Sequence, residues 1–113
     1  MWKGDGRPDR RQQLFGGEGE VRVWTLSGQV PAPFEVVLGC ELAPSGVVGT
    51  HVQERCAEVL IVTEGHGEAW VDGSSMRLGP GATLSLPLGS SLKLRNRSAK
   101  TVLRYLIIKA ASQ

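Results

Sequence analysis

Short runs of apolar and β-branched residues, bounded by Gly, Pro, Ser and Asp, make up most of this sequence. No window sustains the helical spacing of apolar residues, whereas alternation of apolar and polar positions with a period of two recurs. The pattern predicts strands over residues 21–26, 34–42, 49–52, 58–63, 68–71, 75–78, 83–86, 91–95 and 101–109. We therefore expect an all-β protein.

The connections between these strands carry turn chemistry. Asp72-Gly73 is a strong hairpin signal, and Gly79-Pro80-Gly81 and Pro87-Leu88-Gly89 are sharp corners. Many short strands joined in this way favour an immunoglobulin-like sandwich or a jelly-roll barrel. No Trp lies between Cys40 and Cys56, so the Cys–Trp–Cys pattern of the sandwich is absent.

The chain has 113 residues, which is enough for one domain. Residues 1–13 are polar and predict a flexible N-terminal extension, or an arm that adds to a neighbouring edge strand; residues 14–113 form the predicted barrel. No secretory signal or membrane-spanning run is visible, so we expect a cytoplasmic protein that does not bind membranes. A reducing compartment makes free thiols the default for Cys40 and Cys56, although sequence alone leaves a disulfide open.

Two predicted strands are apolar on both faces. In the segment after Glu58, Leu60 and Val62 share one face with Glu58, and Val59 and Ile61 take the other. The last strand is similar, and such strands are usually buried on both sides. A second copy of the chain is the simplest cover for the outer face, so we expect a homodimer; the alternative is cover by the chain's own N-terminal segment.

The net charge of +2 is too small to indicate binding to nucleic acid or to an anionic surface. Acidic residues dominate from Gln12 to Asp72, and only basic ones occur from Gly73 to the C-terminus. We interpret this as pairing between acidic and basic strands. The alternative is an anion-binding face built from the basic residues Arg77, Lys93, Arg95, Arg97, Lys100, Arg104 and Lys109.

Candidate chemistry is concentrated in one short segment that contains His51, Gln53, Cys56 and Glu58. Residues two apart on a strand share a face, so His51 and Gln53 should point the same way, as should Cys56 and Glu58. A His and a carboxylate that converge inside a barrel could bind a divalent metal or act as an acid–base pair.

The spacing of these residues resembles the two motifs of the cupin family. In the first motif, His51-Val52-Gln53 is followed by four residues, Glu58, six residues and Gly65. In the second, Gly81 is followed by five residues, Pro87-Leu88-Gly89, two residues, Leu92, three residues and Asn96. The opening glycine is one position late, at Gly46 instead of Ser45. The resemblance implies a double-stranded β-helix, or jelly-roll barrel.

The resemblance also implies where a metal would bind. Metal-binding cupins hold the ion with two His and one Glu of the first motif and one His of the second. This chain keeps His51 and Glu58 but has Gln53 and Leu92 at the other two places. Gln is a weak ligand and Leu is none, so the site is degenerate. Cys56 could complete a site for Zn, Fe, Mn or Ni together with His51 and Glu58, or it could be a small buried apolar residue.

The leading hypothesis is a small-molecule-binding barrel with weak or no metal binding. Its pocket would be lined by His51, Gln53, Cys56, Glu58 and Leu92. The alternative is a cupin enzyme, either a metal-dependent oxygenase or an isomerase or epimerase, that uses His51 and Glu58 as catalytic groups. A third hypothesis is a structural or regulatory module that acts through its surface. Cupins support many reactions, so the fold selects none of these.

Overall fold

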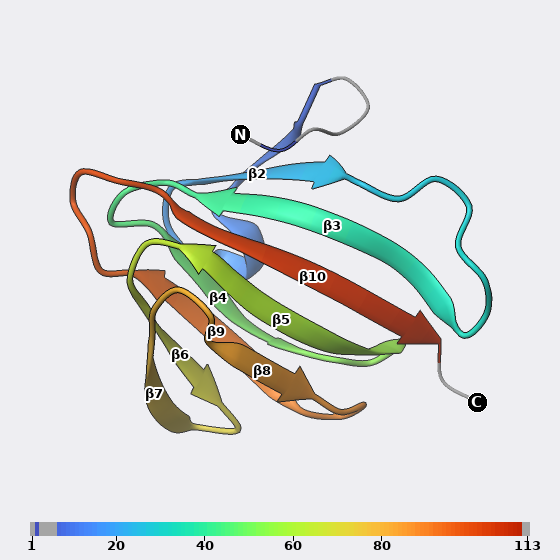
Figure 1. Ribbon diagram of the computed structural model, residues 1–113. Helices are drawn as coiled ribbons and strands as arrows, with labels where there is room; N and C mark the ends of the chain where they lie inside the picture. The colour runs from blue at the N-terminus through green and yellow to red at the C-terminus, as the bar shows by residue number, and fades with distance from the viewer. Residues whose placement is uncertain (1, 3–6, 112–113) are drawn as a thin grey trace.

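The computed structural model describes residue 2 and residues 7–111, and it consists of two facing antiparallel sheets (Figure 1). The larger sheet has the strand order β1-β2-β3-β10-β5-β8 and the smaller one β4-β9-β6-β7. The larger sheet comprises β1 (Asp9–Gln12), β2 (Glu20–Thr25), β3 (Phe34–Leu42), β10 (Leu103–Ala111), β5 (Cys56–Glu64) and β8 (Thr83–Leu86). The smaller sheet comprises β4 (Val47–Val52), β9 (Ser91–Asn96), β6 (Gly67–Val71) and β7 (Ser74–Leu78). The all-β jelly-roll prediction is confirmed.

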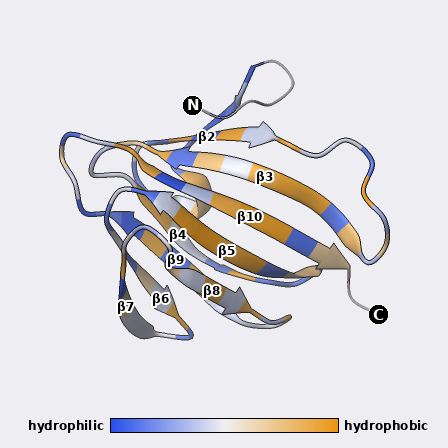
Figure 2. Ribbon diagram, in the orientation of Figure 1, coloured by the Kyte–Doolittle hydropathy of each residue, from blue (hydrophilic) through white to orange (hydrophobic). Residues whose placement is uncertain are grey.

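The core fills the space between the two sheets, because each strand alternates inward and outward side chains. Leu42, Leu60 and Leu103 of the larger sheet are fully buried, as are Leu92 and Leu94 of the smaller one. The apolar stretches of β3, β10 and β5 are the most continuous in the molecule (Figure 2). These three adjacent strands therefore form the centre of the fold.

The predicted hairpin at Asp72-Gly73 joins β6 to β7. Asp72 has φ 50° and Gly73 φ 82°, so both residues are in the left-handed region that a tight two-residue turn requires. The Asp72 carboxylate also accepts a hydrogen bond of 2.9 Å from the Ser91 backbone N–H. This contact ties the turn to the start of β9.

The N-terminal part of the chain is more ordered than its polar sequence indicates. The expected extension, residues 1–13, lies partly outside the described residues, but Asp9–Gln12 forms β1 and pairs with β2. A short 3-10 helix, η1 (Leu14–Gly16), follows and crosses over β4. A Cβ atom on Gly17 would overlap the Val47 carbonyl, and one on Gly49 would overlap the Phe15 carbonyl. These two glycines allow the close crossing.

The outer face of the larger sheet is apolar and partly covered by the chain itself. Leu106 and Ile108 of β10 point outward and remain half-buried. Trp2 packs against Gly39, where a Cβ would lie 2.6 Å from its ring, and its Nε1 donates to the Cys40 carbonyl at 3.4 Å. The N-terminal segment therefore covers one part of this face, while the expected homodimer stays a prediction.

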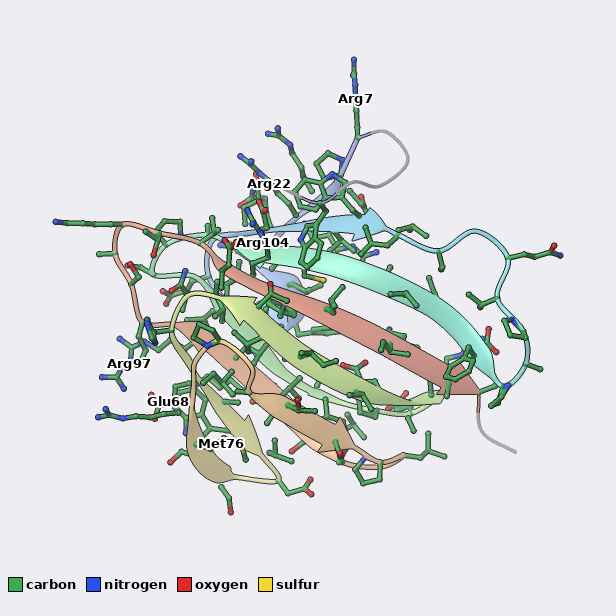
Figure 3. All side chains as sticks on the ribbon, in the orientation of Figure 1. Arg7, Arg22, Glu68, Met76, Arg97 and Arg104 are labelled. Atoms are coloured by element: carbon green, nitrogen blue, oxygen red, sulfur yellow. The ribbon has the colours of Figure 1, made fainter. Side chains whose placement is uncertain are left out.

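Acidic and basic side chains pair locally, which supports the interpretation of charge cancellation. Arg104 bridges Glu41 and Glu64, each at 2.9 Å. Arg97 pairs with Glu68 at 3.2 Å, and the two lie side by side at one end of the molecule (Figure 3). Arg97 and Arg104 thus have acidic partners at ion-pair distance, whereas Lys109, considered below, has none among the described residues.

Within the described range, no helix is long and apolar enough to cross a membrane.

Candidate functional site

A cavity of about 530 Å³ lies between the sheets and is lined by residues from both. Its inner wall is apolar, with Leu38 of β3, Leu92 and Leu94 of β9, and Ile107 of β10. The residues that line it are Arg11, Leu14, Phe15, Val21, Val23, Glu35, Leu38, Cys40, Val48, His51, Val52, Gln53, Glu54, Arg55, Cys56, Glu58, Leu92, Leu94, Tyr105, Ile107 and Lys109. A cavity of this size can hold a small organic molecule.

His51 and Gln53 lie together at the end of β4, as their spacing predicts. The Gln53 amide nitrogen is 3.3 Å from His51 Nε2. With the amide in this orientation Gln53 donates and Nε2 accepts, so the ring proton lies on Nδ1. Phe15 stacks on the imidazole, with ring centroids 4.1 Å apart and planes inclined by 17°. The imidazole is therefore held on two sides.

The other predicted site residues line the same cavity. Cys56 and Glu58 come from the start of β5, and Glu58 is only 5% exposed. Leu92 of β9 is the direct cross-strand partner of His51 and is 1% exposed. All five predicted residues are thus brought to one cavity, in which Leu92 contributes apolar surface beside the imidazole.

The residues present do not fit the metal that metal-binding cupins hold. Among the described residues, no group of three or more His, Cys, Asp and Glu side chains converges closely enough to bind an ion. His51 Nε2 already accepts from the Gln53 amide, and Leu92 occupies the fourth place with an apolar side chain. A tight transition-metal site needs at least three strong ligands, which this arrangement does not supply.

Both cysteines are free thiols, and only Cys56 is partly exposed. Cys40 lies in the core beside Tyr105, and burial raises the pKa of its thiol to about 12. Burial also raises the pKa of Tyr105 well above its usual range. Both groups are therefore neutral at physiological pH, so they are polar but uncharged parts of the cavity wall.

Burial acts in opposite directions on the two titratable groups that the sequence singles out. It lowers the pKa of His51 and raises the pKa of Glu58, because both prefer the neutral form away from water. The Gly49 backbone raises the pKa of His51 to a lesser degree, although no hydrogen bond of acceptable geometry reaches Nδ1 from the described residues. The charge of Lys109 partly offsets the effect of burial on Glu58.

Replacing Glu58 by Gln should stabilise the protein at neutral pH. The folded-state pKa of Glu58 lies above its unfolded value near 4.5, so the folded state binds the proton more readily. The stability that Glu58 contributes is therefore present below pH 4.5 and is lost as the pH rises through the folded pKa. We expect Glu58→Gln to raise the midpoint of thermal unfolding at pH 7 by a few degrees, the effect of about 1 kcal/mol in a domain of this size. The gain should shrink as the pH falls.

The matched control is Glu35→Gln, which removes an exposed carboxylate from the rim of the same cavity. Its unfolding midpoint should stay near that of the unaltered protein at every pH. A Glu58→Gln variant that is less stable at pH 7 would show that the ionised carboxylate is well paired in the fold.

Sequence reasoning missed most of the cavity lining, and two of the missed residues, Lys109 and Phe15, bear on its chemistry. Lys109 shares the inward face of β10 with Tyr105 and Ile107, and its cross-strand partner is Glu58. Its spacing of two from Ile107 is a signal that could have found it. Phe15 has no such signal, because its place on His51 depends on a left-handed backbone, φ 54°, and on the crossing of η1 over β4.

Comparison with known proteins decides the family. The family model described as "Cupin domain" matches residues 39–109, which includes both motifs and most of the strands. The chain belongs to the cupin family. No match was found among curated proteins.

Solved structures resemble this cupin over most of its length. A predicted oxalate decarboxylase from Thermotoga maritima has a TM-score of 0.87 at 23% identity, over 96% of this chain and 95% of that one. KdgF from Halomonas sp. has a TM-score of 0.71 at 16% identity, over 92% and 89%. A cupin 2 conserved barrel domain protein from Salinispora arenicola has 0.65 at 27% identity, over 78% and 74%. At these identities the likeness concerns the fold.

Proposed function

We propose that this cupin binds a small organic molecule in the cavity between its sheets, without a tightly held metal ion. The observation that carries the proposal is Leu92, a fully buried apolar side chain at the place where metal-binding cupins have a ligand. It continues the apolar wall formed by Leu38, Leu94 and Ile107. An apolar wall beside polar groups such as His51, Gln53 and Glu58 is typical of a pocket that orients a largely apolar ligand.

The alternative function is an enzyme that uses His51 and Glu58. The Thermotoga maritima relative is named as a predicted oxalate decarboxylase, which keeps an enzyme among the hypotheses for this chain. Here Nε2 of His51 accepts from Gln53, and burial lowers the pKa of the imidazole. Both features weaken the imidazole as a proton acceptor for a substrate, so we favour the binding function.

The cytoplasmic location expected from the sequence stays a prediction.

Filling the cavity should weaken binding of a neutral aromatic probe. Ile107 points into the cavity, and Ile108, the next residue, points to the outer face. We expect Ile107→Trp to weaken binding of 2-naphthalenemethanol about tenfold or more, since the indole would occupy the probe's space. Isothermal titration calorimetry measures the affinity.

The control is Ile108→Trp, which adds the same side chain to the same strand outside the cavity. It should bind the probe as the unaltered protein does. If both variants lost the same affinity for the probe, either the probe binds elsewhere or both substitutions destabilise the fold. The thermal unfolding midpoints of the two variants distinguish these cases. No binding by the unaltered protein would contradict the proposed function.

A further inference from the structure

Lys109 places a positive charge inside the barrel. Inward side chains alternate along β10, so Tyr105, Ile107 and Lys109 all line the cavity. Its cross-strand neighbours are Glu58 on β5 and Val36 on β3, which places it near the C-terminal end of a central strand of the larger sheet. The lysine therefore lies among the central strands of the fold.

The charge of Lys109 acts on titratable groups from three other strands. Burial is the largest influence on the pKa of Glu58, His51 and Cys40, but Lys109 lowers the pKa of all three. These residues belong to β5, β4 and β3. A single ammonium group can influence residues of both sheets if it faces the cavity that the sheets share.

This ammonium has no counter-ion among the described residues. No carboxylate oxygen there lies within 4.0 Å of its Nζ. The other cation of the regular part of β10, Arg104, does not line the cavity and is bridged by Glu41 and Glu64. A half-buried cation without a partner carries a desolvation cost that a bound anion would offset.

We propose that the ligand of this cupin is an organic acid, with its carboxylate on Lys109 and its apolar body against Leu38, Ile107 and Leu92. The proposal rests on the proposed function and specifies its ligand class. The apolar wall and the unpaired ammonium belong to one cavity, and Ile107 is two residues from Lys109 on the same face. A molecule that joins an anionic end to an apolar body satisfies both features together.

Glu58 is the buried carboxylate that opposes this assignment, because it lines the same cavity; Glu35 and Glu54 also line it, but both are exposed. A pocket governed by Glu58 would prefer a cationic ligand, whereas one governed by Lys109 prefers an anion. Three probes with the same ring system separate these cases: 2-naphthoate, 2-naphthalenemethanol and 2-naphthalenemethylamine. Each carries a one-carbon substituent on the same ring position, and that substituent is negative in the acid, neutral in the alcohol and positive in the amine.

The experiment titrates each probe into the full chain at pH 7.5 and follows binding by calorimetry. We expect 2-naphthoate to bind about tenfold more tightly than the alcohol, the preference that one charge-assisted hydrogen bond provides, and the amine to bind most weakly. Lys109→Met should remove the preference and leave binding of the alcohol in place, and Lys109→Arg should keep the preference.

Lys93→Met is the matched control, since it removes the same charge from a lysine that lies over Trp70 on the smaller sheet and does not line the cavity. It should keep the full preference for the acid. Equal affinity for acid and alcohol, tighter binding of the amine, or a preference that survives Lys109→Met would overturn the assignment to Lys109. Each of those results still leaves a binding pocket, whereas failure of all three probes contradicts the proposed function itself.

Discussion

Replacing Asn96 by Ala should lower the free energy of unfolding by about 3 kcal/mol, because several buried backbone groups would lose their partner at once. The Asn96 amide nitrogen lies 3.1 Å from the Leu42 carbonyl, 3.1 Å from that of Ala43 and 2.8 Å from that of Thr101. Its side-chain oxygen accepts from the Ser98 N–H at 2.9 Å. The side chain is 1% exposed, so water cannot readily replace it.

Urea denaturation followed by Trp fluorescence measures this loss. Arg97→Ala is the control, since it removes the adjacent exposed side chain and a surface ion pair with Glu68, and it should cost less than 1 kcal/mol. Asn96→Asp should be at least as destabilising as Asn96→Ala, because it sets a carboxylate against three carbonyl oxygens. An Asn96→Ala variant as stable as Arg97→Ala would show that this residue does not hold the β3 and β9 ends together.

Restoring both altered motif positions should create metal binding. We expect the double variant Gln53→His/Leu92→His to bind close to one equivalent of Zn²⁺, since it adds two imidazoles to His51 and Glu58 in one cavity. Inductively coupled plasma mass spectrometry after gel filtration measures the bound metal. His is polar and Leu92 is fully buried, so the metal-free double variant should also be less stable than the unaltered chain.

The matched control is Gln53→His/Lys93→His, which adds the same two side chains but places one on the outer face of β9. It should bind far less Zn²⁺ than the variant that carries both histidines in the cavity. If both variants bound the same amount of Zn²⁺, the added histidines would bind zinc wherever they were placed. That result would contradict the assignment of Leu92 to the fourth ligand position.

The fold was predictable because its signals are local. Alternation with a period of two located β2 to β10 to within about two residues but did not predict β1, and Asp72-Gly73 specified its hairpin. The last strand begins at Leu103 instead of residue 101, because Ser98 and Asn96 organise the preceding turn through hydrogen bonds to Thr101. A turn held by side-chain hydrogen bonds between residues three and five apart has no alternating pattern that would reveal it in the sequence.

Most of the candidate site residues that the sequence predicted were those placed by the spacing of the two motifs. The two motifs placed His51, Gln53, Glu58 and Leu92, and all four line one cavity. Lys109 was grouped with the basic residues of the chain's end, although its spacing of two from Ile107 places both on one face. The spacing does not tell which face points inward, because the register of β10 shifts after Arg104 and after Lys109. Such irregularities redirect side chains and are not visible in a single sequence.

The N-terminal contacts could not be predicted for a different reason. Trp2 and Phe15 lie in a polar segment without periodicity, and each is placed by a glycine far along the chain. Gly39 leaves room for the Trp2 ring, and Gly49 allows the close approach of Phe15. Contacts across such sequence distances are properties of the packed fold.

The metal content of the unaltered chain tests the central claim most directly. The protein would be purified without a His-tag or chelator, incubated with Zn, Fe, Mn and Ni salts, desalted, and measured by mass spectrometry beside a His51→Ala variant. We predict much less than one equivalent of any metal, with no difference between the two proteins. Close to one equivalent of a single metal that disappears in His51→Ala would contradict the account, because the cavity would then be a metal centre despite Gln53 and Leu92.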